Sequence, residues 1–315
     1  MATNGRFWRW RLSAREVRLL IYFAILLAVV LWKFAPRPWK PTFTLETAHY
    51  AIASTAAREQ TEEIGRVVEG LYLVYSNLLR DLPAVRQPHP KLRLRLYKDR
   101  KEFRRTNPSA GWAEAFYRRP CCHAYYSAAE VNPYHWMLHE AVHQLNAEVA
   151  QLKLEQWLDE GLGEYLSTCR IKNNVPVLGT VDPNTYPVWW IEEIATTGGL
   201  AADLTNGSII PLRAIITGRG GPSLDRQFNL YYLHWWTLTH FLFEGGRDRS
   251  NCLDLIRSGG GLEAFEKCIG PADETQRDWH GHVGRLKAKL SGEDLRRSLF
   301  KQKSSSLATN VVAPR

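Results

Sequence analysis

Apolar and polar residues form two kinds of pattern in the first third of the chain. Residues 42–53 and 91–97 alternate between apolar and polar, and in the second segment leucines are separated by arginines. A period of two places alternate side chains on one face of a strand, so both segments are predicted to be strands. Between them, residues 58–82 repeat apolar side chains at helical spacing, which predicts a long amphipathic helix.

The later part of the chain is predicted to be mostly helical. We expect helices over residues 134–150, 154–170 and 228–243, and a cluster of short helices over residues 252–290. Because the strands come first and most of the helices follow, the predicted fold class is α+β, with a small N-terminal sheet and a mostly helical part after it.

Length and composition are sufficient for a folded domain with a sizeable core. The chain has 315 residues, of which 45% are hydrophobic and 23% are charged. Its net charge of +9 is carried by the two ends, since residues 1–40 contribute +7 and residues 285–315 contribute +6, leaving −4 for the middle. The folded part is therefore mildly acidic, and nucleic acid is not an expected partner.

The N-terminus has the pattern of a membrane-targeting segment. Five arginines precede an uninterrupted apolar run over residues 19–32, and no small-x-small cleavage site follows it. We therefore expect a basic cytoplasmic segment over residues 1–18, a signal anchor or transmembrane helix over residues 19–35, and a proline-rich linker over residues 36–41. The rest of the chain would then lie outside the cytoplasm, in the periplasm or the extracellular space; secretion after cleavage is the alternative.

The folded domain is expected to span residues 42–290. Residues 291–315 are basic, include three consecutive serines and are expected to be a disordered tail. The five cysteines show no metal-binding spacing. Outside the cytoplasm, Cys252 and Cys268 are the best candidates for a disulfide, and the alternative is that all five are small buried apolar side chains.

A candidate metal-binding motif lies in the predicted helix over residues 134–150. His139, Glu140 and His143 form a His-Glu-x-x-His pattern. The two histidines are one helical turn apart and project from the same face, so both imidazoles can bind one Zn²⁺. Glu140 lies beside them, where it can accept a proton from metal-bound water.

A third ligand is expected from the next predicted helix, because a catalytic zinc normally has three protein ligands. Residues 157–165 have the sequence Trp-Leu-Asp-Glu-Gly-Leu-Gly-Glu-Tyr. If the chain returns here as a second helix, it presents Glu160 to the metal. Glu164 is one turn further along and can bond to a ligand imidazole.

These two segments together resemble the gluzincin metallopeptidases, and among them the uncharacterised bacterial peptidase-MA-like proteins more than thermolysin. Sixteen residues separate His143 from Glu160, a shorter interval than in the aminopeptidase-N-like branch. The resemblance implies a zincin-like peptidase domain, a bound Zn²⁺ held by His139, His143 and Glu160, and a peptide or protein substrate.

In the aminopeptidase-like relatives, a tyrosine on a later helix hydrogen-bonds the oxyanion of the reaction intermediate. The resemblance places Tyr232 at that position, with Tyr231 and His234 as lesser candidates. No Gly-x-Met-Glu-Asn segment precedes His139, so the exopeptidase function is not supported. Residues 118–126 are instead a candidate for an edge strand on which a peptide substrate adds.

The sequence as a whole predicts a membrane-anchored, extracytoplasmic zinc metallopeptidase in which Glu140 is the general base. Two alternatives remain open. One is a zincin-fold scaffold that binds metal and catalyses little or nothing. The other is a zinc hydrolase that acts on non-peptide amides.

Overall fold

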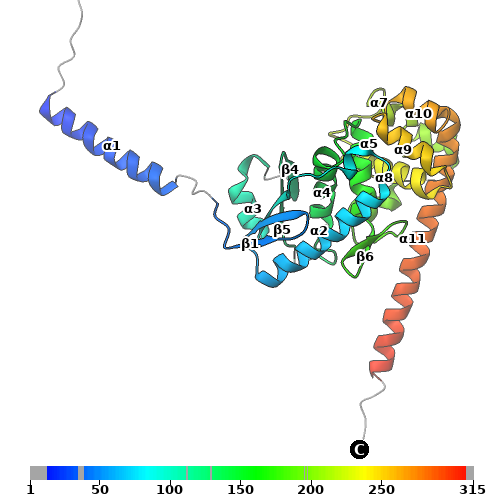
Figure 1. Ribbon diagram of the computed structural model, residues 1–315, viewed down its shortest axis with the longest axis horizontal. Coiled ribbons are helices and arrows are strands. Elements are labelled where there is room, and N and C mark those ends of the chain that lie inside the picture. Colours follow the sequence, from blue (N-terminus) through cyan, green and yellow to red (C-terminus); the bar gives the residue numbers. More distant parts are fainter. Residues whose placement is uncertain are drawn as a thin grey trace, which may run out of the picture. The chain divides into compact units, whose positions relative to one another are not determined.

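The computed structural model describes residues 13–34, 39–110, 113–127, 130–194, 196 and 198–309 (Figure 1). The chain forms two separate units, Met1–Lys40 and Pro41–Arg315. Each unit is described by itself below.

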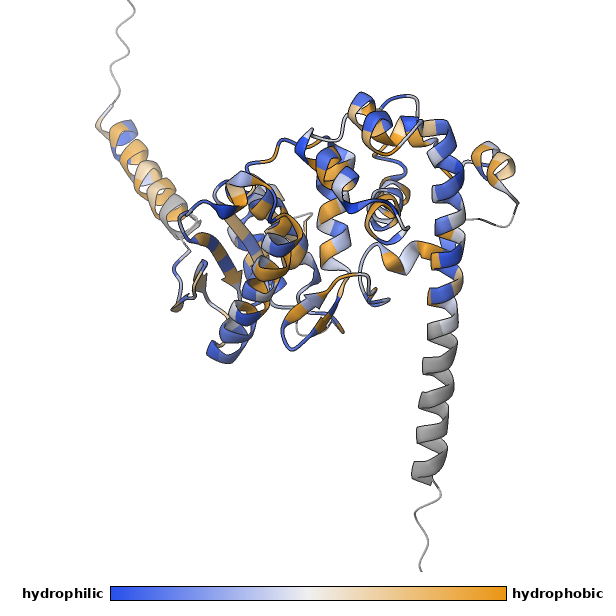
Figure 2. Cartoon of the chain, turned by 45° about the vertical axis from the view of Figure 1, so that its right-hand side comes forward, coloured by the Kyte–Doolittle hydropathy of each residue, from blue (hydrophilic) through white to orange (hydrophobic). Residues whose placement is uncertain are grey.

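The first unit contains helix α1, Ala14–Phe34, which is hydrophobic along most of its length (Figure 2). Ser13 precedes it, and its backbone N–H and hydroxyl donate to the Glu16 carboxylate at 2.7 and 2.9 Å. Among the helices of the described residues, none is both long and apolar enough to cross a membrane. The prediction of a transmembrane helix over residues 19–35 is therefore not borne out. The uninterrupted apolar run has 14 residues, fewer than the roughly 20 that a bilayer core requires.

Parts of the predicted N-terminal segments cannot be compared with the structure. Residues 1–12, in the predicted cytoplasmic segment, and residues 35–38, mostly in the predicted linker, lie outside the described residues.

The second unit begins with a five-stranded sheet in the order β1-β2-β3-β5-β4. The three central strands are parallel to one another, and the two edge strands, β1 and β4, are antiparallel to their neighbours. The strands are β1 (Phe43–Glu46), β2 (Tyr50–Ser54), β3 (Leu92–Tyr97), β4 (Ala115–Arg118) and β5 (Cys121–Tyr125).

Two details of the predicted strands were wrong. Residues 42–53 form a hairpin rather than one strand, because the Thr47 N–H donates to the Tyr50 carbonyl at 2.9 Å. Glu69 of the next helix fixes this turn by accepting from the Thr47 hydroxyl at 2.6 Å and from the His49 N–H at 2.7 Å. In residues 118–126, β5 is paired on both sides, and the edge strand is β4, which ends at Arg118.

Two helices, α2 (Arg58–Leu78) and α4 (His135–Glu148), pack against the sheet. In β3 the leucines are buried and the arginines are exposed, so one face of the sheet belongs to the core and the other is open. This is the arrangement that the alternating pattern of residues 91–97 predicts. The short helix α3 (Arg100–Thr106) contacts β3 and β5.

Helix α4 also packs against α5 (Gln156–Ser167), and α5 packs against α8 (Phe228–Glu244), so these three helices form the centre of the second unit (Figure 1). The helices predicted over residues 58–82, 134–150, 154–170 and 228–243 are thus confirmed with slightly different ends. The remaining elements are α6 (Leu200–Thr205), α7 (Leu212–Thr217), α9 (Arg249–Arg257), α10 (Leu262–Cys268), α11 (Ala272–Thr309), the hairpin β6 (Arg170–Lys172) and β7 (Val175–Val177), and the 3-10 helices η1 (Pro83–Arg86), η2 (Pro108–Ala110) and η3 (Val188–Glu193).

The small sheet followed by helices agrees with the predicted α+β class. Two differences concern the C-terminal region. Helix α11 continues to Thr309, through most of the segment that was expected to be a disordered tail. The five cysteines are free, so the predicted pairing of Cys252 with Cys268 is not found, and Cys252 Sγ instead donates to the Leu242 carbonyl at 3.1 Å.

A pair of buried histidines joins α8 to α11, with His240 Nδ1 3.0 Å from His282 Nε2. Burial, and then the neighbouring His282, lower the pKa of His240 to about 3. In the unfolded chain a histidine binds its proton near pH 6.5. The folded state therefore binds this proton less tightly than the unfolded state does. Stability is lost as the pH falls from about 6.5 towards 3.

At pH 5 we expect His240 alone to lower the free energy of unfolding by about 2 kcal/mol relative to pH 7.5, since each unit of pKa difference is worth about 1.4 kcal/mol. Urea denaturation at pH 7.5, 6 and 5 measures this loss. His240→Gln should show a shallower dependence on pH than the wild type. Equal dependence in the two proteins would contradict the assignment.

Candidate metal centre

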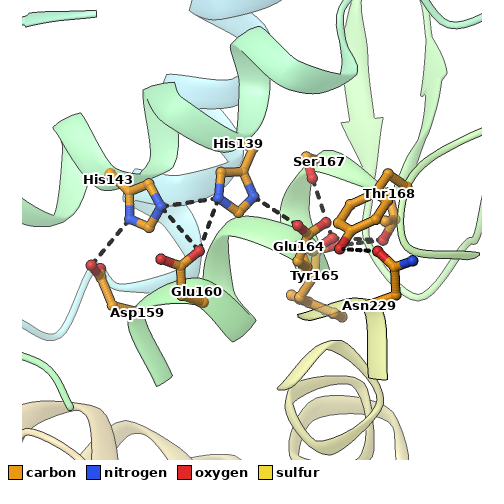
Figure 3. Close-up of polar contacts among 10 residues, drawn as sticks. His139, His143, Asp159, Glu160, Glu164, Tyr165, Ser167, Thr168 and Asn229 are labelled. Carbon is orange, nitrogen blue, oxygen red and sulfur yellow. Dashed lines mark hydrogen bonds and ion pairs between the residues drawn. The ribbon is translucent and has the colours of Figure 1, made fainter. Parts of the chain in front are cut away.

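The candidate metal centre lies where α4 packs against α5. Helix α4 carries His139 and His143 one turn apart, and α5 carries Glu160 (Figure 3). The two helices approach closely because Gly163 has no side chain: a Cβ atom at this position would lie 2.9 Å from the His139 ring. The glycine therefore lets α5 bring Glu160 to the histidines.

The side chains of His139, His143 and Glu160 converge on one point. The two Nε2 atoms are 3.0 Å apart. Glu160 Oε2 lies 3.2 Å from Nε2 of His139 and 3.6 Å from Nε2 of His143. Within the described residues, these three form the group of ligand atoms, all within 4.8 Å of one another, that could hold a metal ion. Two imidazole nitrogens and a carboxylate oxygen are donors that suit a divalent transition metal.

Each histidine is oriented by a carboxylate at its other ring nitrogen. His139 Nδ1 lies 3.1 Å from Glu164 Oε1, and His143 Nδ1 lies 3.1 Å from Asp159 Oδ2 (Figure 3). Such contacts fix the rotation of an imidazole and leave Nε2 facing the metal. Glu164, the residue that the sequence analysis named for such a contact, therefore lies beside His139.

Asp159 also contacts the candidate centre, and the sequence analysis did not single it out. Its other oxygen, Oδ1, accepts from Asn146 Nδ2 at 2.7 Å, and the buried Tyr75 hydroxyl donates to Asn146 Oδ1 at 2.6 Å. A chain of contacts therefore runs from α2 through Asn146 and Asp159 to His143. The one available signal is that Asp159 directly precedes Glu160.

The electrostatics of the centre keep Glu160 charged. Burial alone would raise the pKa of Glu160, but hydrogen bonds from His139 and His143 outweigh it and hold that pKa far below its ordinary value. Glu164 is fully enclosed, and burial raises its pKa. The pKa values of the two carboxyl groups are therefore shifted in opposite directions. For Glu160, the two imidazoles stabilise the charged form by more than burial destabilises it.

Glu140 lines the same cleft as His139, His143 and Glu160 and contacts the edge of the sheet. Its Oε2 accepts the backbone N–H of Tyr117 in β4 at 2.7 Å. This N–H points out of the edge strand, so the open edge of β4 faces the same space as the three ligand residues. The hydrogen bond holds the carboxylate of Glu140 beside the metal-binding group.

A cleft of about 670 Å³ opens over these residues, and its size is that of a typical ligand site. Strand β4 forms one wall. Outside β4, the aromatic side chains that line the cleft are Trp136, Tyr186, Phe228 and Tyr232.

Tyr232 is the one of the three candidate oxyanion residues that lines this cleft. Its ring centroid is 6.3 Å from that of His139. Burial, and then the charges of Glu160 and Glu164, raise the pKa of Tyr232 far above its ordinary value, so its hydroxyl keeps its proton. By contrast, Tyr231 donates to the Pro222 carbonyl at 2.9 Å, and His234 Nε2 accepts the Ile210 N–H at 3.0 Å.

Tyr186 also lines the cleft, and its hydroxyl donates to Asn229 Oδ1 at 3.2 Å. No motif surrounds Tyr186 in the sequence, and it reaches the cleft from the loop before η3, so its position depends on the tertiary fold.

Comparison with known proteins adds no assignment. The chain matches no protein-family model, and no curated protein matches it.

Proposed function

We propose that the protein is a zinc metallopeptidase of the gluzincin type, with a zincin-like fold. The observation that supports this most directly is that His139, His143 and Glu160 converge while Glu140 stands beside them at a cleft bordered by an open strand edge. A buried structural site would need the ligands but neither the cleft nor the adjacent carboxylate.

Zn²⁺ bound by the three side chains would supply a Lewis acid that polarises the substrate carbonyl and makes a water molecule more acidic. In this proposal Glu140 accepts the proton of the attacking water and then transfers it to the leaving amine. The Tyr117 N–H holds the Glu140 carboxylate in place for both transfers. Asp159 and Glu164 keep the two imidazoles oriented.

The substrate class follows from the edge of β4. An extended peptide can add to an exposed sheet edge through backbone hydrogen bonds, and this edge borders the cleft beside Glu140. Since the Tyr117 N–H is bound to Glu140, such a peptide would use the other outward-facing backbone groups of β4. Such binding needs no free terminus, so it favours cleavage within a polypeptide. The protonated Tyr232 hydroxyl is proposed to stabilise the oxyanion.

Metal content tests the first step of the proposal. The full-length chain, kept in non-ionic detergent because α1 exposes apolar side chains, should contain about one zinc ion per chain by mass spectrometry. His143→Ala and Glu160→Ala each remove one of three ligands and should weaken binding at least roughly 100-fold, beyond the effect of losing an orienting contact.

His89→Ala is the matched control, because His89 lies outside the metal-binding group and should leave the zinc content unchanged. Folded wild-type protein that binds no zinc would refute the proposed function. Zinc that persists in both ligand variants would refute the assignment of the ligands.

A further inference from the structure

The open face of the sheet carries a second groove, on the opposite side from the buried leucines of β3. Its volume is about 690 Å³, close to that of the metal cleft. All five strands, β1, β2, β3, β5 and β4, contribute to its floor. At about 4.8 Å between strands, these five span roughly 19 Å, which about six extended residues would cover.

The lining of this groove is strongly basic. Four arginines contribute to it, of which Arg119 is paired with Glu148 at 3.0 Å. The single glutamate of the lining, Glu46, is bonded to Lys91 at 2.9 Å. The four arginines are Arg93, Arg95, Arg118 and Arg119. A groove with this composition favours an anionic ligand, since guanidinium groups bind carboxylates through paired hydrogen bonds.

The register of the strands leaves space around these guanidinium groups. Ala51, Arg93, Cys121 and Arg118 lie opposite one another across β2, β3, β5 and β4. The small side chains of Ala51 and Cys121 therefore flank Arg93, so a ligand can reach its guanidinium group from both sides.

The pKa of a neighbouring histidine, His123, is lowered in part by the positive charge of these arginines. In the next row across the sheet, Arg95 pairs with His123, and His123 pairs with Phe116. The rings of Phe116 and His123 stack at 4.4 Å, and the Arg118 guanidinium lies 5.4 Å from the centre of the Phe116 ring. Burial, and then Arg95 and Arg118, lower the pKa of His123 to about 4.

The groove adjoins the metal cleft through strand β4. Phe116 lines both spaces, and its neighbour Tyr117 contacts Glu140 on the cleft side. Arginines line the groove, whereas acidic residues line the cleft. The acidic residues are Glu114, Glu140, Asp159, Glu160 and Glu164.

We propose that this basic sheet face, defined by Arg93, Arg95, Arg118 and Arg119, binds an acidic segment of the polypeptide that the metal centre cleaves. The inference rests on the proposed function. A substrate that runs along β4 passes Phe116, which lines both spaces, and an acidic segment of that substrate is attracted by the arginines. A free nucleotide or a nucleic acid would fit the charge but would not explain why the groove shares Phe116 with the cleft.

Peptide binding to the full-length Glu140→Gln chain tests the proposal without turnover. Two fluorescent ten-residue peptides are compared by anisotropy, one with five glutamates at alternate positions and one with five glutamines instead. The glutamate peptide should bind at least tenfold more tightly at 50 mM salt, and its advantage should shrink at 300 mM because salt screens exposed charges.

The double variant Arg93→Ala/Arg118→Ala should lose this advantage. The matched control is Arg277→Ala/Arg285→Ala, which removes two exposed arginines of α11 and should keep it. Equal binding of the two peptides, or an advantage that survives the first double variant, would overturn the inference. So would a nucleotide or oligonucleotide that displaces the acidic peptide at a lower concentration than the unlabelled peptide does. Failure of the proposed function is distinguishable, because it shows in zinc content and cleavage rather than in this assay.

Discussion

Glu140→Gln is expected to reduce peptide cleavage by roughly 10²- to 10⁴-fold while the zinc content stays near one ion per chain. Glutamine has nearly the shape of glutamate, and its amide oxygen can still accept the Tyr117 N–H that Glu140 accepts at 2.7 Å. It cannot take a proton from water at neutral pH. The variant therefore removes proton transfer and keeps the geometry. The measurement is the rate of cleavage of the best substrate from a peptide library, with zinc measured on the same preparation.

Glu148→Gln is the matched control for this experiment. Glu148 lies on the same helix and accepts the hydroxyl of the same tyrosine, Tyr117, at 2.5 Å, but it does not line the cleft. Its replacement should leave the rate within about threefold of the wild type. Full activity in Glu140→Gln would refute the general-base assignment. A zinc-loaded wild type that cleaves no peptide would instead favour the metal-binding scaffold.

The parts of the candidate site that were predictable from the sequence are those set by local spacing. His139 and His143 share a helical face because one turn separates them, and that relation holds whatever the helix packs against. To predict Glu160 as a ligand, a second helix also had to be expected to return to the first. That expectation came from the resemblance of residues 157–165 to a known segment. The structure brings all three together.

The residues that were missed depend on contacts between distant segments. Asp159 acts through His143 and Asn146, and its neighbour Glu160 was the more obvious ligand of the two. The hairpin in residues 42–53 depends on Glu69, which lies on a helix beyond both strands. Alternation predicts which face of a strand is buried but not which strands are neighbours, so it could not show that β4 rather than β5 is the edge.

The close packing of α5 on α8 leads to the second large expected effect. A Cβ atom on Gly161 would lie 2.2 Å from Thr239 Oγ1 and 2.8 Å from the Trp235 carbonyl oxygen, both on α8. The carbonyl belongs to the helix backbone, so it cannot move without moving α8. Gly161→Ala is therefore expected to lower the free energy of unfolding by about 3 kcal/mol through overpacking. For a chain of this size that corresponds to roughly 10 °C in the melting temperature.

Gly292→Ala makes the same substitution in a helix where the new methyl group meets nothing within 4 Å. It should leave stability unchanged or raise it by up to about 1 kcal/mol, because alanine has the higher helix propensity. Thermal unfolding of the two variants measures the contrast. Adding Thr239→Ala to Gly161→Ala removes the nearer clash and should recover part of the loss. Equal melting temperatures for the two single variants would show that α5 and α8 are not packed as closely as the geometry requires. Since these helices carry Glu160 and Tyr232, that result would also weaken the placement of Tyr232 beside the metal centre.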